Sequence, residues 1–122
     1  MKIKNYKQLI VWQKAMSLVM EIYKLVKILP REELFALSDQ MRRAAVSVPS
    51  NIAEGNARHY TKDYIFFLSV ARASTAELET QLLICINLNY IKKDQAESAL
   101  NLCNELTKML TTMLIKLEAR KD

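Results

Sequence analysis

Glycine and proline are nearly missing from this sequence of 122 residues, which contains one glycine and two prolines. Tight turns, which depend on these two residues, must therefore be few. No long run of β-branched residues predicts a strand. Alanine, leucine, lysine, glutamate, glutamine and methionine are abundant instead, and they favour helix. Length and composition predict one all-α domain over residues 1–122, with a core large enough to exclude water.

Residues for catalysis and metal binding are also scarce, since His59 is the only histidine and Gly55 the only glycine. One histidine excludes a histidine-based metal centre and catalysis by several histidines. A lone glycine excludes a glycine-rich phosphate loop. Three acids, Glu54, Glu77 and Glu79, can converge, but exposed or ion-paired carboxylates explain them better. We therefore predict no catalytic residue, no cofactor and no metal, and a protein that is not an enzyme.

Long apolar runs are absent as well, because none approaches the roughly 20 residues that span a bilayer. The basic N-terminus is interrupted by Gln13 and Lys14 and lacks a small-residue cleavage site. We therefore expect no membrane partner and a cytoplasmic protein. Cys85 and Cys103 lie among apolar residues without a CxxC spacing. Two buried free thiols explain them better than a disulfide.

Positive charge is concentrated in the first quarter of the chain. Residues 1–31 carry seven Lys or Arg and only one acid, whereas the other 91 residues have a net charge of −1. A basic segment on a neutral body is typical of a surface that meets phosphate, although it can also serve solubility alone. The candidate nucleic-acid-binding residues are Lys2, Lys4, Lys7, Lys14, Lys24 and Lys27.

Hydrophobic periodicity predicts four helices, over about residues 9–29, 38–57, 62–88 and 94–121. Pro30 ends the first, and Ser38, Thr61 and Asp94 are candidate N-caps for the other three. Asn89 follows the third helix, where a left-handed residue is common. Four helices of this length with short connections predict an antiparallel up-down-up-down bundle.

Pro49 lies inside the second predicted helix and can be interpreted in two ways. It can kink a continuous helix by leaving the carbonyl of Ala45 without its hydrogen bond. Alternatively, Ser47 can cap a new helix that has Pro49 in its first turn. The apolar arc keeps its phase across the proline, which favours a continuous helix kinked at Pro49.

The fourth predicted helix carries a narrow apolar seam with alternating steps of three and four residues, as in coiled coils. Its members are Ala96, Ala99, Cys103, Leu106, Leu110, Met113 and Leu117. Cations end this helix, where the helix dipole favours them.

The first and third helices carry more apolar surface than a bundle core needs. Outside one polar arc, nearly all of the first helix is apolar. On the third helix a second apolar face, interrupted by Glu77, includes the oligomer-interface candidates Phe66, Val70, Ile84 and Leu88. A four-helix bundle buries one stripe per helix, so the surplus predicts self-association.

The segment QMRRAAVSVPSNIAEGNAR, at 40–58, carries an unusual polar stripe on the second helix. The stripe contains no lysine and is built from short hydrogen-bonding groups and one acid between two arginines. Its candidate residues are Arg43, Asn51, Glu54 and Arg58. We expect them on one face, packed in an ordered polar network that lines a shared surface or binds a phosphate. An ordinary polar flank that orients the helix explains the stripe equally well.

Four stretches together resemble the four-helix-bundle family named for proteins encoded in 23S rRNA intervening sequences. They are VWQKAMSLVMEIYKL at 11–25, the polar-stripe segment at 40–58, FLSVARASTAELETQL at 67–82 and LNYI at 88–91. The resemblance covers nearly the whole chain. Ala73 and Asn89 depart from it, because the family usually has glycine at both positions.

This resemblance implies a left-handed antiparallel bundle that assembles into a homopentamer with a central channel. It also implies kinship with accessory proteins of diversity-generating retroelements, which bind RNA and a reverse transcriptase, and no enzymatic activity. The sequence and the resemblance together predict an oligomeric bundle that binds nucleic acid, above all RNA. The alternative is a protein-interaction scaffold, such as an accessory subunit of a reverse transcriptase, without direct nucleic-acid binding.

Overall fold

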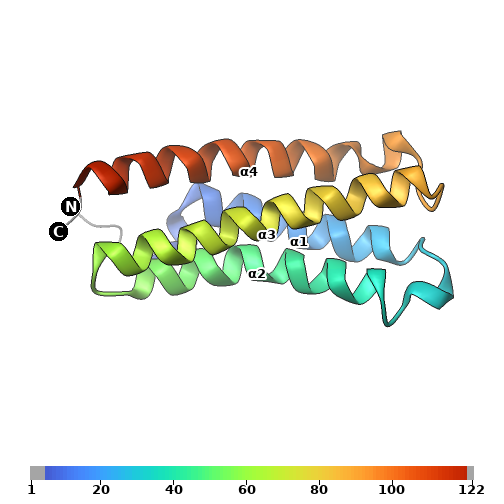
Figure 1. Ribbon diagram of the computed structural model, residues 1–122, viewed down its shortest axis with the longest axis horizontal. Helices are drawn as coiled ribbons and strands as arrows, with labels where there is room; N and C mark the ends of the chain where they lie inside the picture. The colour runs from blue at the N-terminus through green and yellow to red at the C-terminus, as the bar shows by residue number, and fades with distance from the viewer. Residues whose placement is uncertain (1–4, 121–122) are drawn as a thin grey trace.

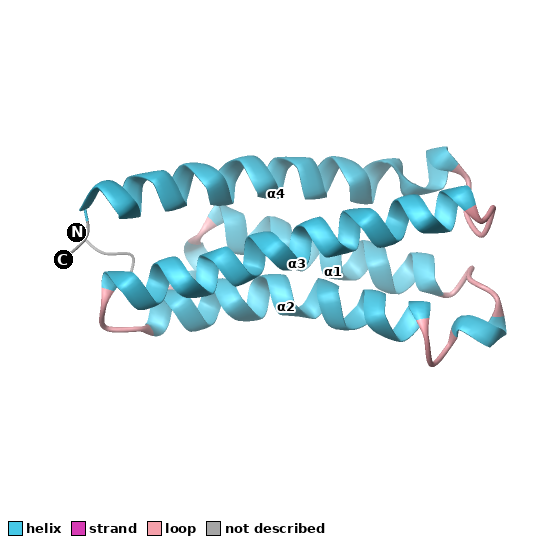
Figure 2. Ribbon diagram, viewed as in Figure 1, coloured by secondary structure: helices cyan, strands magenta, loops and turns pink. Residues whose placement is uncertain are grey.

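The computed structural model describes residues 5–120 and contains in that range four α-helices, two short 3-10 helices and no strand (Figure 2). The elements in order are η1 (Tyr6–Gln8), α1 (Ile10–Val26), η2 (Arg31–Glu33), α2 (Leu37–Ala57), α3 (Thr61–Asn87) and α4 (Lys93–Arg120). Consecutive helices run antiparallel (Figure 1), and α1 packs against α4 as well as against α2. The predicted up-down-up-down bundle is therefore confirmed. None of its described helices is long and apolar enough to cross a membrane.

The core is formed by one apolar stripe from each helix, as the periodicity predicts. On α4 the buried residues reproduce the predicted seam except at one place, where Leu114 is buried and Met113 only half-buried. A straight α-helix has 3.6 residues per turn, so a seam that advances by 3.5 residues drifts off the core-facing side. The extra step of four, from Leu110 to Leu114, returns the seam to the core.

α2 runs through Pro49 as one helix, and the proline side chain is buried. The continuous helix is thus confirmed, and the alternative of a new helix capped by Ser47 is wrong. Instead of capping, the Ser47 hydroxyl lies 2.8 Å from the hydroxyl of Ser74 on α3. A hydrogen bond across the helix pair therefore lies two residues before the proline.

The prediction of Ser38 as the N-cap of α2 is wrong. The helix begins at Leu37, whose backbone N–H donates to Oε1 of Glu33 at 3.2 Å. Ser38 is buried in the first turn. A long carboxylate reaching forward from η2 satisfies the same unpaired donors that a short capping side chain satisfies.

The N-termini of α3 and α4 also begin one residue before the predicted starts. Thr61 is the first residue of α3, and Tyr60 precedes it without a capping side-chain bond. Asp94 lies inside the first turn of α4. There the side chain of Gln95 accepts a hydrogen bond from the backbone N–H of Lys92 at 2.8 Å. This is the returning half of a capping box, made by glutamine three residues after the cap.

Asn89 ends α3 with φ 62°, as the sequence predicts for a left-handed residue. The N–H of Tyr90 donates to the carbonyl of Cys85, and the N–H of Asn89 donates to that of Ile86. These two bonds form a Schellman motif, in which asparagine tolerates the left-handed conformation better than most side chains. At the end of α1, by contrast, the helix stops at Val26 and residues 27–29 form a turn before the proline.

The α1–α2 and α3–α4 connections lie at the same end of the bundle (Figure 1). A side-chain hydrogen bond ties them together. The hydroxyl of Tyr90, after α3, donates to Oε2 of Glu33, before α2, at 2.8 Å. The bond to Glu33 raises the pKa of Tyr90, because it stabilises the protonated phenol. Glu33 therefore caps α2 with one oxygen and holds the α3–α4 connection with the other.

Both cysteines are free and buried, as predicted. Burial in the apolar core raises the pKa of Cys85 to about 11 and that of Cys103 to about 12. The reactive thiolate is therefore scarce at neutral pH, and both residues act as small core side chains.

Gly55 allows a close approach of α2 to α3. A Cβ atom at this position would lie 2.9 Å from the Cβ of Phe67 and 2.9 Å from the ring of Tyr64. The Cβ of Phe67 moves only with its backbone, so the helices would have to separate. The one glycine of the chain therefore stands where two helices touch.

We expect Gly55→Ala to destabilise the bundle, although alanine normally stabilises a helix by about 1 kcal/mol relative to glycine. Overpacking typically costs about 1–3 kcal/mol, and here it outweighs that gain. Thermal melts of the variant and of Ser50→Ala, an exposed position on the same helix, provide the comparison. The expectation is wrong if Gly55→Ala melts at or above the parent temperature.

Candidate nucleic-acid interface

The lysines predicted to bind nucleic acid do not form one patch. Lys2 and Lys4 lie outside the described residues. Lys7 is exposed in η1, before α1 begins, whereas Lys24 and Lys27 lie at the other end of that helix. A helix of 17 residues is about 25 Å long, which separates the two groups. Lys14, between them, forms an ion pair with Glu105 of α4 at 3.0 Å.

Exposed cations gather where α1 ends and α4 begins. We define the basic end of the bundle by Lys24, Lys27, Arg31, Lys92 and Lys93, all of them exposed. The first three come from the end of α1 and from η2, whereas Lys92 ends the α3–α4 connection and Lys93 begins α4. The Tyr90–Glu33 hydrogen bond holds the two segments together. Sequence reasoning missed Lys92 and Lys93, because only the tertiary structure brings them beside the first quarter of the chain.

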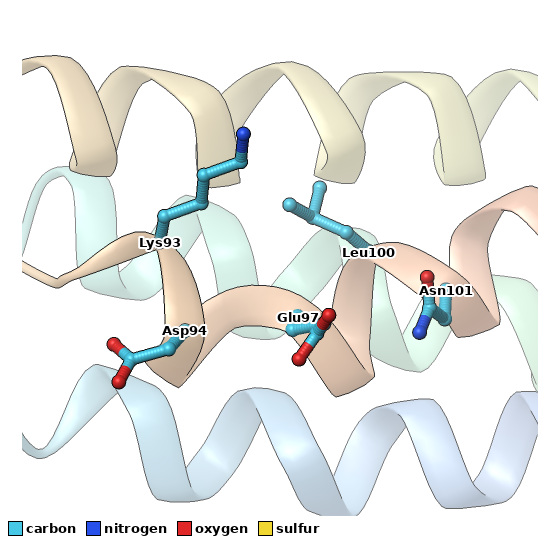
Figure 3. Close-up of a pocket in the computed structure, with 5 residues that line it drawn as sticks. All are labelled: Lys93, Asp94, Glu97, Leu100 and Asn101. Carbon is cyan, nitrogen blue, oxygen red and sulfur yellow. The ribbon is translucent and has the colours of Figure 1, made fainter.

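A surface hollow on the first turns of α4 adjoins the basic end and is drawn in Figure 3. Lys93 and Leu100 lie on its α3 side, and Asp94 lies on its α1 side. Glu97 and Asn101 complete the lining, so its polar groups carry both signs of charge. No cluster of three or more potential metal ligands is found among residues 5–120.

The polar stripe of α2 follows one side of the helix, but its hydrogen bonds form three local groups. At its start, Arg43 pairs with Asp39 at 3.0 Å and is 79% exposed. In the middle, the amide of Asn51 donates to the carbonyl and to the hydroxyl of Ser47, at 2.8 and 2.9 Å. Since Ser47 also contacts Ser74, this middle group joins α2 to α3.

Glu54 and Arg58 form the third group, an ion pair of 2.8 Å at the end of α2. Their side chains are 52% and 46% exposed, so water reaches both. The guanidinium of Arg58 also lies 4.8 Å from the ring centre of Phe67, in a cation–π contact. The expected continuous network is therefore divided into separate local groups, and the carboxylate of Glu54 is not buried.

Two apolar stripes remain uncovered in the bundle. The α1 stripe consists of Met16, Met20 and Tyr23, all exposed. The α3 stripe consists of the predicted interface residues Phe66, Val70, Ile84 and Leu88, of which only Val70 is half-buried. Glu77, which interrupts the α3 stripe, accepts a hydrogen bond from the buried Gln81 at 3.3 Å.

Both stripes lie on the side of α2. Lys14 on α1 and Arg72 on α3 reach the opposite way, to α4, where they contact Glu105 and Thr111. Successive residues of a helix are rotated by 100° about its axis, so the residues of each stripe lie on a different face from the residue that contacts α4. α2 is therefore flanked by one apolar stripe on each side, with its own polar stripe between them.

Comparison with known proteins places this geometry in a family. A family model described as "23S rRNA-intervening sequence protein" matches residues 7–112. The structure is similar to a crystal structure of a protein with unknown function from the S23 ribosomal protein family of Bacteroides thetaiotaomicron. The two chains are 30% identical with a TM-score of 0.80, and the match covers 86% of this chain and 98% of the other. No curated protein matches the chain.

The exposure of the Glu54–Arg58 pair leads to a stability prediction. We expect Glu54→Ala, Arg58→Ala and the double variant to lose a few tenths of a kcal/mol at most, because exposed i,i+4 pairs contribute little. Urea unfolding of the four proteins in a double-mutant cycle measures the coupling of the pair. A loss above about 1 kcal/mol for Glu54→Ala would show instead that the carboxylate is desolvated, for example by a second copy of the chain.

Proposed function

This chain belongs to the 23S rRNA-intervening sequence protein family, and on that premise we propose that it forms a non-enzymatic, homo-oligomeric helical bundle that binds nucleic acid, above all RNA. The observation that carries the proposal is the pair of uncovered apolar stripes flanking α2. Exposed apolar side chains that gather on one face are typical of interaction sites in soluble proteins. Assembly through these stripes repeats the basic end in every copy, and repetition turns weak phosphate contacts into useful affinity.

The positions of the stripes support a ring rather than a pair of copies. The two stripes differ in sequence and lie on opposite flanks of α2, so the α1 stripe of one copy contacts the α3 stripe of the next. Such head-to-tail contacts close into rings when the rotation allows it. Five copies are the number that the family resemblance implies. Since the two contact sides meet along α2, this helix faces the axis of the ring, which suits its polar outer surface.

Phosphate binding is supported by the charge of the basic end. Its five cations lie in or beside two connections that one hydrogen bond holds together. In a ring of parallel bundles all copies present this end on one rim, which sums the contacts of several copies on one nucleic-acid chain. Nothing in these contacts selects a base sequence, so we expect weak sequence preference.

Light scattering on the purified protein tests the assembly. We expect a homo-oligomer at micromolar concentration, and smaller species for Phe66→Glu or Val70→Glu, because a buried charge opposes contact between the stripes. Circular dichroism should show that both variants remain folded. Ile115→Glu, at an exposed apolar residue of α4 outside both stripes, is the matched control and should keep the parent mass. A monomeric parent protein would contradict the proposal.

Titration of RNA binding with salt tests the nucleic-acid part. We expect affinity to fall steeply as salt rises, because each phosphate contact releases counterions. Reversing Lys24 and Lys27 to Glu should abolish most binding, whereas Lys108→Glu, an exposed lysine of α4, should change it little. Lack of binding by the parent at low salt would favour the alternative that the uncovered stripes suggest, a protein-interaction scaffold that docks a partner such as a reverse transcriptase.

A further inference from the structure

Phe35 is the most exposed large apolar residue among the described residues of the chain. Its side chain is 91% exposed, in the connection between η2 and α2. Full burial of a phenylalanine contributes about 1.5–3 kcal/mol, and this residue contributes almost none of that to the monomer. The residue two positions later, Leu37, does pack against the core. Packing within the bundle therefore does not account for an aromatic ring at this position, whereas contact with a binding partner does.

The backbone around Phe35 is held on both sides. Before it, the carbonyl of Leu34 accepts a hydrogen bond from Nη2 of Arg42 at 3.3 Å. After it, the N–H groups of Ala36 and Leu37 donate to the carbonyl and the side chain of Glu33, at 3.0 and 3.2 Å. The turn is therefore fixed while the ring it carries faces solvent. A rigid backbone presents a side chain for binding at a low entropic cost.

The charges beside Phe35 select the kind of partner. Lys27 and Arg31 belong with Phe35 to the chain segment that links α1 to α2, and the Tyr90–Glu33 hydrogen bond brings Lys92 and Lys93 to the same end. The acids at this end are Glu32 and Asp94, both exposed, and Glu33, which is engaged by Leu37 and Tyr90, so the cations remain in excess. An aromatic side chain among cations is the arrangement that binds single-stranded nucleic acid, with a base stacked on the ring and phosphates on the cations. A second copy docked end to end would bring like charges together, which disfavours it.

We propose that Phe35 is a stacking site for an unpaired base of single-stranded nucleic acid, with Lys27 and Arg31 contacting the phosphates beside that base. This site rests on the proposed nucleic-acid binding and adds the preferred form of the ligand, since a base inside a duplex cannot reach the ring. In the proposed ring, the site recurs once per copy on the basic rim, and each copy takes up one unpaired base.

The test compares two RNA probes, a single strand that contains one 2-aminopurine and its blunt duplex. We expect Phe35→Ala and Phe35→Leu to weaken binding of the single strand by at least about 5-fold, the lower end of the range for one stacked base, because the substitution removes the aromatic ring from every copy. Both variants should bind the duplex as the parent does, and both should lose the fluorescence quenching of the 2-aminopurine. Phe35→Tyr should behave as the parent because it keeps the ring.

Tyr60→Ala is the matched control, since Tyr60 is 60% exposed in the connection at the opposite end of the bundle (Figure 1) and should leave binding unchanged. If the parent binds neither RNA, the proposed function itself is wrong. If the parent binds but Phe35→Leu binds the single strand equally well, the proposed function stands and the stacking site is wrong. A change in the mass of the assembly for Phe35→Ala would assign the ring to a contact between copies, which also overturns the site.

Discussion

The backbones of α2 and α3 come so close at Gly55 that a methyl group there would lie 2.9 Å from the Cβ of Phe67. The packing of α2 against α3 depends on this contact. On the same pair of helices, the middle group of the polar stripe meets α3, where the hydroxyls of Ser47 and Ser74 bond directly. The close contact also fixes the rotation of α3 about its axis. The α3 stripe therefore stays outside the core, because α3 cannot turn to bury it without losing this contact.

A second constraint acts at the end of the bundle, where one carboxylate replaces a conventional cap. Glu33 serves the first turn of α2 with one oxygen and Tyr90 with the other. This arrangement brings the α3–α4 connection, with Lys92 and Lys93, beside the cations of the α1 side. It also fixes the turn that carries Phe35. The side chain of Glu33 therefore determines both the capping of α2 and the arrangement of the cations at this end.

The sequence predicted those features that depend on local periodicity and on single-residue conformation. The four helices, the continuity of α2 through Pro49 and the left-handed Asn89 are of this kind. Capping was predicted less well, because a short side chain such as Ser38 is only one of several groups that can reach the first turn. The choice of Glu33 depends on where η2 lies, and no local pattern specifies that.

By itself, the sequence determined an all-α bundle with surplus apolar surface, because amphipathic periodicity fixes which residues share a helix face. It also determined that the cysteines are buried and that the first quarter of the chain is basic. Only the tertiary structure decided which flank of each helix meets which neighbour. That decision placed both apolar stripes beside α2, divided the basic lysines between two ends and left Phe35 outside. The physical reason is that contacts between residues distant in the chain arise from packing, which no single helix contains.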